Sequence, residues 1–158
     1  MENTGCCPQF KPELYENKEW HFENKLFLKS HIPTIFHIPM ISAMNKMMTR
    51  IWNVAHKAGA VNEGEFLLLA DDISNFRCDY YLAVNKEIEN EEIVKITGDY
   101  ITKVFDGPYQ NVPKWIKEMD GFLKLQNKKA KKYYIYYTTC PKCAKVYGHN
   151  YVVIFAQI

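Results

Sequence analysis

Two short stretches, Phe36-His37-Ile38-Pro39 and Phe105-Asp106-Gly107-Pro108, share a Phe-x-x-Pro pattern and lie 69 positions apart in the chain. Each one follows a run of strand-forming residues and precedes a run of apolar residues at helical spacing. Two further strand-like runs come after each helical run. The sequence therefore predicts that a strand–helix–strand–strand (βαββ) unit occurs twice.

In the first copy, a strand region is expected over residues 25–38. Apolar residues at intervals of three and four predict a helix over residues 40–58, with Gly59 as its terminator. Two strands then follow, at residues 65–70 and 76–84.

In the second copy, a strand is expected over residues 98–105. Asn111 is suited to cap a helix that carries Pro113 in its first turn, with Gly121 either at its end or in a weak last turn. The final strands are expected at residues 133–139 and 150–157.

Each βαββ copy is too small to cover its own sheet, so the two are expected to pair. The predicted fold class is α+β, with two pseudo-symmetric βαββ halves, antiparallel sheets and a ligand cleft between the halves. Half one covers about residues 25–85 and half two about 97–158. Residues 1–24 form an N-terminal extension that packs on the domain through the aromatic residues Phe10, Tyr15, Trp20 and Phe22.

Composition narrows the class of protein. The chain has 158 residues, 47% of them apolar and 24% charged, which predicts a folded domain and not a disordered one. The apolar runs are too short to cross a bilayer, and no secretory signal is recognisable, so a cytoplasmic location without membrane contact is expected. With a net charge of only +2, nucleic acid is not an expected partner, although a lysine-rich run lies at residues 124–132.

The cysteines suggest reduced thiols or metal ligands, because five of them cannot all pair in disulfides. Cys140 and Cys143 have the Cys-x-x-Cys spacing that can chelate Zn²⁺, and Cys6 or Cys7 could complete the ligand set. One such pair without a second matched pair is equally explained by free or redox-sensitive thiols. No cofactor is therefore expected, and zinc is the alternative.

Aromatic residues make up 15% of the chain, eleven of them tyrosines. Tyrosine combines a flat apolar ring with a polar tip, which suits both half-buried sheets and ligand pockets. In Tyr133-Tyr134-Ile135-Tyr136-Tyr137 the side chains alternate between the two faces of a strand, so one set faces inward and either lines a pocket or packs in a half-buried sheet.

The stretch from Ile96 to Tyr109, with its Gly98-Asp99-Tyr100 strand and Gly107-Pro108-Tyr109 end followed by Trp115, resembles the GyrI-like, or AraC effector-binding, superfamily. Arg77-Cys78-Asp79 is similar to that superfamily's preceding strand. The two ends of the chain, with Cys6-Cys7 and Cys140-Pro-Lys-Cys143, resemble a stand-alone subgroup that is sometimes labelled hydrolase.

The resemblance implies a protein that binds bulky aromatic molecules between its halves, or one that hydrolyses strained rings there. Many relatives have a carboxylate in the last strand, but this chain has Tyr147-Gly148-His149-Asn150-Tyr151 at that place. His149 could act as a base instead. The ligand-binding candidates are Asp79, Tyr81, Tyr109, Trp115, Tyr134, Tyr136, His149 and Tyr151.

The expected function is that of a stand-alone small-molecule-binding protein that captures amphipathic aromatic compounds. The chain shows no DNA-binding domain. One alternative is a hydrolase of cyclopropane-type or other small electrophilic compounds, with His149 as the catalytic base. The second alternative is a zinc-stabilised interaction module.

Overall fold

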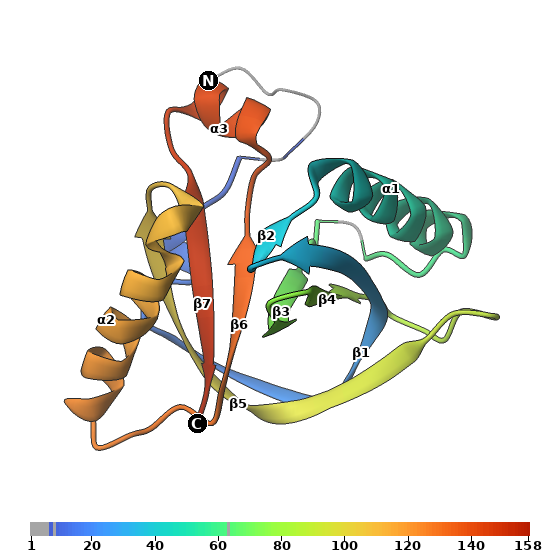
Figure 1. Ribbon diagram of the computed structural model, residues 1–158. Coiled ribbons are helices and arrows are strands. Elements are labelled where there is room, and N and C mark those ends of the chain that lie inside the picture. The colour runs from blue at the N-terminus through green and yellow to red at the C-terminus, as the bar shows by residue number, and fades with distance from the viewer. Residues whose placement is uncertain (1–6, 8, 63) are drawn as a thin grey trace. The chain divides into compact units, whose positions relative to one another are not determined.

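The structure is a computed structural model that describes residues 7, 9–62 and 64–158 (Figure 1). The chain divides into two compact units. The first-half unit spans Phe22–Thr97, and the second-half unit joins the residues up to His21 with Gly98–Ile158. Each unit has its own antiparallel strands and its own long helix, as the duplicated sequence pattern predicts.

The first-half unit follows the order strand, helix, strand, strand. Strand β4 is the central strand and pairs antiparallel with both β1 and β3. The short strand β2 folds back on the end of β1. The elements are β1 (Lys18–Ile35, which begins in the other unit), β2 (Ile38–Pro39), α1 (Ile41–Lys57), β3 (Leu68–Ser74) and β4 (Arg77–Ala83).

The second-half unit repeats this order and this pairing. Its last strand, β7, is central and pairs antiparallel with β5 and β6. The predicted α+β class with two antiparallel βαββ halves is thus confirmed. The elements are η1 (Pro12–Leu14), β5 (Ile93–Asp106, which begins in the other unit), η2 (Tyr109–Asn111), α2 (Val112–Lys124), β6 (Lys132–Tyr137), α3 (Pro141–Tyr147) and β7 (Tyr151–Gln157).

Several local predictions differ from the structure. Strand β1 begins at Lys18, within a stretch for which no strand was predicted, and β5 begins at Ile93, five residues before the predicted start. Helix α3 was not predicted. Gly121 lies in the last turn of α2, one of the two placements expected for it, because Leu123 in that turn is fully buried and its packing outweighs the low helix propensity of glycine. Asn111 is the N-cap residue of α2 as predicted, but its side chain accepts no cap hydrogen bond from the helix.

The two long helices each bury one stripe of side chains at helical spacing. Helix α1 buries Met47, Ile51 and Ala55, and helix α2 buries Trp115, Met119 and Leu123. Burying each of the larger side chains stabilises the fold by roughly 1.5–3 kcal/mol. The helices therefore cover one face of each sheet and leave the opposite face for other contacts.

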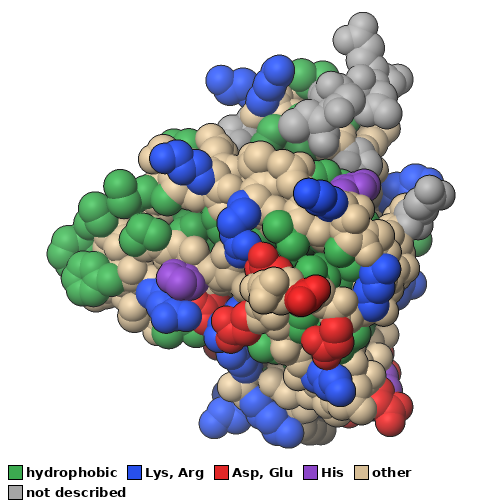
Figure 2. All heavy atoms as spheres, turned by 90° about the vertical axis from the view of Figure 1, so that its right-hand side faces the viewer, with side chains coloured by type: hydrophobic (Ala, Val, Ile, Leu, Met, Phe, Trp, Pro, Cys, Tyr) green, Lys and Arg blue, Asp and Glu red, His purple; other side chains and the backbone are tan. Residues whose placement is uncertain are grey.

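Hydrophobic side chains gather at one end of the surface shown in Figure 2. In the first-half unit, the exposed apolar residues surround the end of β1 and the turn between β3 and β4: Ile35, Phe36, Ile38, Ile41, Ile73 and Phe76. The rings of Phe36 and Phe76 lie 5.9 Å apart. Among the described residues, the helices are all too short or too polar to span a membrane.

Candidate functional site

The sheet of the second-half unit has one face that is covered by α2 and one that is rich in aromatic rings. The antiparallel register places Tyr134 opposite Phe155, and Tyr136 opposite Val153. Because side chains alternate along a strand, these residues share a face with Tyr151, two positions before Val153. We call this face, defined by Tyr134, Tyr136, Tyr151 and Phe155, the ring face.

The residues just before β1 lie on the ring face. Phe10 contacts Tyr136 and Tyr151, with ring centroids 6.1 and 5.6 Å apart. Tyr15 lies between Phe10 and Trp20 in a stacked series, at 5.3 and 5.2 Å. The N-terminal segment, defined as residues 9–20, thus covers part of the ring face with its own aromatic side chains.

Two polar residues fix the N-terminal segment to β5. The hydroxyl of Thr102, which is fully buried, donates to the carbonyl of Tyr15 at 2.6 Å and accepts from the indole nitrogen of Trp20 at 2.9 Å. The carboxylate of Glu16 accepts from the backbone N–H of Val104 at 2.8 Å and from the Lys103 ammonium at 2.9 Å. These hydrogen bonds and the ion pair hold Tyr15, Glu16 and Trp20 in place against β5.

A hollow of about 540 Å³ lies beside the middle of the N-terminal segment, at the end of β5 and the start of β7, and it is open to solvent. Its volume is within the range of small-molecule sites. Carboxylates and aromatic rings both contribute to its wall. The lining residues are Pro12, Glu13, Glu16, Val104, Phe105, Asp106 and Tyr151.

Asp106 in this wall is paired with His149, the residue that the sequence suggested as a base. One carboxylate oxygen of Asp106 lies 2.7 Å from Nδ1 of His149, and the other accepts from the backbone N–H of Asn150 at 2.9 Å. The imidazole stacks on the Tyr151 ring, with centroids 5.0 Å apart and planes 13° from parallel. The pair is about half exposed, so Nε2 of His149 can reach a solute.

The tyrosines of the ring face and its neighbourhood differ in exposure. Tyr134 and Tyr136 are buried, and Tyr151 is half-buried. Burial, with the nearby Tyr15 as a lesser cause, raises the pKa of Tyr136 well above that of a free phenol. Burial also raises the pKa of Tyr100 to about 12. These phenols therefore remain protonated donors at neutral pH.

Trp115 and Tyr109 lie elsewhere in the same unit. Trp115 projects from α2 and stacks on Phe105 at 5.3 Å, so it packs in the core on the helix-covered side of the sheet. Tyr109 is 41% exposed and its ring meets that of Tyr137 edge-on at 5.9 Å. The structure does not bring these two rings together with Tyr134, Tyr136 and Tyr151.

Asp79 and Tyr81 lie in the first-half unit, on β4. They share the face opposite the side on which the Tyr80 hydroxyl meets Met44 of α1. Asp79 is buried and its carboxylate bonds Arg77 at 2.6 Å, while Lys29 lies at 3.5 Å. Apart from Tyr109, the candidate tyrosines of each half therefore lie on the face that its helix leaves open.

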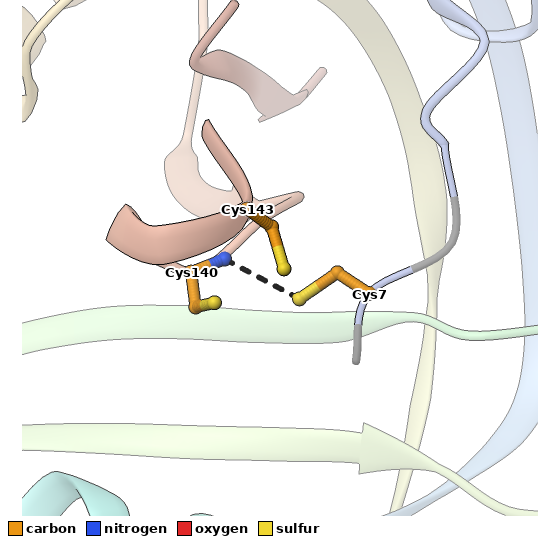
Figure 3. A group of neighbouring side chains, drawn as sticks. All are labelled: Cys7, Cys140 and Cys143. Carbon is orange, nitrogen blue, oxygen red and sulfur yellow. Dashed lines mark hydrogen bonds between the residues drawn. The ribbon is translucent and has the colours of Figure 1, made fainter. Parts of the chain in front are cut away.

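Three cysteines from distant parts of the sequence meet beside α3. The Sγ atoms of Cys7, Cys140 and Cys143 all lie within 4.8 Å of one another. Figure 3 shows the three side chains turned toward one another, with the backbone N–H of Cys140 donating to Sγ of Cys7 at 3.5 Å. Cys6, the other suggested ligand, lies outside the described residues.

The sequence did not indicate Asp106, Glu13 or Glu16 as site residues. Asp106 belongs to the second Phe-x-x-Pro stretch, and its position there was a signal that could have been used. Glu13 and Glu16 carried no comparable signal, because Glu16 meets its partner Val104 across 88 positions of the chain.

Comparison with solved structures supports the GyrI-like fold that the sequence resembles. The chain matches the C-terminal domain of EcmrR with a TM-score of 0.62 at 14% identity, over 91% of this chain and 97% of that one. A hydrolase encoded by lin2189 from Listeria innocua matches with a TM-score of 0.58 at 8% identity, over 89% and 90% of the two chains. A further structure described as a hydrolase from Listeria innocua matches with a TM-score of 0.57 at 8% identity, over 90% and 92%.

These identities are low, so the structural matches establish the shared fold alone. No curated protein matches the sequence. The model of the family described as bacterial hydrolase matches residues 1–158. The chain therefore belongs to the bacterial hydrolase family.

Proposed function

We propose that this protein binds a small, flat amphipathic molecule, as the sequence suggested, in the hollow at the edge of the ring face. The observation that carries the proposal is the composition of the wall, where the Tyr151 ring lies among the carboxylates of Glu13, Glu16 and Asp106. A ring stacks on Tyr151, and a positively charged group on the same molecule is attracted by the carboxylates. The preferred ligand is thus an aromatic cation.

The carboxylates are not equally available. Glu16 forms an ion pair with Lys103, and Asp106 is paired with His149. Glu13 is exposed in the wall. The preference for cations is therefore expected to be moderate and to weaken with added salt. Shape and stacking contribute most of the affinity.

A binding assay with three dyes of similar size, one cationic, one neutral and one anionic, tests the proposal. Replacing the Tyr151 ring by alanine should weaken binding of the cationic dye about tenfold, from the loss of roughly 1.4 kcal/mol of ring contact. Phe76→Leu is the matched control, because Phe76 is an exposed ring that does not line the hollow. Equal affinities for wild type and Tyr151→Ala would refute binding at this place.

Hydrolysis at the edge of the same hollow is a second candidate, favoured by the family description and by His149, which does not line the hollow but contacts two residues that do, Asp106 and Tyr151. Asp106 would hold Nδ1–H of the imidazole, which leaves Nε2 as a base for an attacking water. The proton of that water would pass to Nε2 while its oxygen forms a bond to the electrophilic ring carbon and the strained C–C bond of the ring breaks. The electron pair of the broken bond would pass to the electron-accepting group of the substrate, which then takes the proton back from Nε2. Tyr151, stacked on the imidazole, fixes the plane of the ring.

The enzyme test follows ring-opened product from a cyclopropane-bearing electrophile. His149→Gln should abolish turnover and leave dye affinity within about threefold of wild type, because the ring that stacks on the dye is that of Tyr151. His21→Gln is a close control, since His21 pairs with Asp99 at the same 2.7 Å distance and Asp99, unlike Asp106, does not line the hollow. Turnover that persists in His149→Gln would reject this role for His149.

A further inference from the structure

The cluster of Cys7, Cys140 and Cys143 does not line the proposed hollow. Its geometry suits a function separate from that of the hollow. The three sulfur atoms lie within 4.8 Å of one another, although Cys7 is 133 positions before Cys140. We infer that these three cysteines form a binding site for a thiophilic divalent cation, Zn²⁺, which fastens the N-terminal segment to α3.

The sulfur spacing is compatible with such an ion. Two Zn–S bonds of about 2.3 Å at the tetrahedral angle place their sulfur atoms about 3.8 Å apart. The cluster thus needs to contract by about 1 Å at most, which rotation of the half-buried Cys7 and Cys140 side chains can supply. Three thiolates fill three tetrahedral positions, which leaves the fourth to water or to a ligand from outside the cluster.

The backbone around Cys7 is held in place before any ion binds. The Tyr147 hydroxyl donates to the carbonyl of Cys7 at 2.6 Å, and the N–H of Cys140 donates to its sulfur. A hydrogen bond to sulfur stabilises the thiolate that a metal requires. Cys143 is fully buried, so its sulfur is oriented by the packing of α3.

Three thiolates and one divalent ion together carry one net negative charge, and positively charged surroundings stabilise such a group. Lys142 and Lys145 alternate with the cysteines on α3, and neither lysine is buried. Thiolate ligands also require a reducing compartment, in agreement with the cytoplasmic location expected from the sequence.

The role follows from the place of the ligands. Cys7 lies two residues before the N-terminal segment, whereas Cys140 and Cys143 belong to the connection between β6 and β7. An ion bound to all three therefore joins the segment to the end of the ring face. We assign the site a structural role, because its ligands join two distant segments of the chain and do not line the hollow.

The test titrates the reduced, metal-free full chain with Co²⁺ and then with Zn²⁺. We expect thiolate-to-Co²⁺ charge-transfer absorption and the visible bands of four-coordinate Co²⁺, saturating at about one ion per chain and displaced by Zn²⁺. Cys7→Ser and Cys140→Ser should each weaken binding by at least about a hundredfold. Cys78→Ser should leave it unchanged, because Cys78 is outside the cluster.

Circular dichroism checks that each variant is folded, and Cys7→Ser is decisive because Cys7 lies outside all helices and strands. Hydrogen exchange at residues 9–20 should slow when Zn²⁺ is added to wild type, and not when it is added to Cys7→Ser. Wild type that binds no stoichiometric metal, or that forms a disulfide within the cluster when purified under reducing conditions, would overturn the inference. Equal loss of binding in Cys78→Ser would overturn it as well.

Discussion

Replacing Thr102 by valine should release the N-terminal segment from the ring face. Valine has nearly the shape of threonine but no hydroxyl, so the Trp20 N–H loses its acceptor and the Tyr15 carbonyl loses its donor. An unsatisfied buried polar group costs about 1–3 kcal/mol, and both groups here are partly buried. We therefore expect the free energy of unfolding to fall by about 3 kcal/mol.

Thr102→Ser is the matched control, since it retains both hydrogen bonds and removes one methyl group, at a cost of about 1 kcal/mol. Urea unfolding of the three proteins measures the difference. A double-mutant cycle with Trp20→Phe should show coupling of about 0.5–3 kcal/mol between the two positions. The reasoning fails if Thr102→Val is no less stable than Thr102→Ser, or if the cycle shows no coupling.

Two further predictions concern the turn after β5 and the buried ionisable groups. Gly107→Ala should lower the free energy of unfolding, measured with urea, by about 1–3 kcal/mol, because Gly107 has φ +147° and a Cβ there would lie 3.3 Å from the Trp115 ring. Gly121→Ala is the control and should raise the free energy of unfolding by about 0.5–1 kcal/mol, because Gly121 lies in a helix with open space around it. An unchanged stability of Gly107→Ala would contradict the argument. Burial raises the pKa of Cys78 from 9.0, and that of Tyr100 from 10.0, to about 12 in each case, so the folded state holds these protons more tightly than the unfolded state. Urea midpoints should therefore fall between about pH 9 and about pH 12, and a midpoint that rises over this range would contradict the assignment.

The sequence was sufficient to predict the duplication because its signals are local. The helical stripe that contains Ile51 and Ala55 and the strand that leads to Phe105 depend only on neighbouring residues, and both lie where the pattern put them. Helix α3 was missed because seven residues are too few to show a helical period. The early start of β1 was missed because Lys18 and Glu19 do not favour strands by themselves.

The candidate site could be predicted only in part, because its residues meet through strand register. His149 was suggested as a base from its residue type, and its pairing with Asp106 follows from the register that places Asp106 opposite Tyr151 across β5 and β7. A shift of one residue in that register would turn Asp106 to the other face of the sheet. The two Phe-x-x-Pro stretches also differ in residue type at their second position. His37 occupies the position equivalent to Asp106, and it pairs with Asp72 at 2.5 Å.

The N-terminal segment connects the two proposals made for the second-half unit. It has a single short 3₁₀ helix and no strand pairing before Lys18, so ordering it costs chain entropy that side-chain anchors must offset. Thr102 and Glu16 anchor its later part, and the cysteine cluster anchors its beginning. Because Glu13 and Glu16 form one side of the hollow and Asp106 and Tyr151 the other, a ligand in the hollow contacts the segment and the sheet together. An ion at the cysteines would therefore strengthen ligand binding without touching the ligand, since part of the ordering cost would already have been met before the ligand arrives.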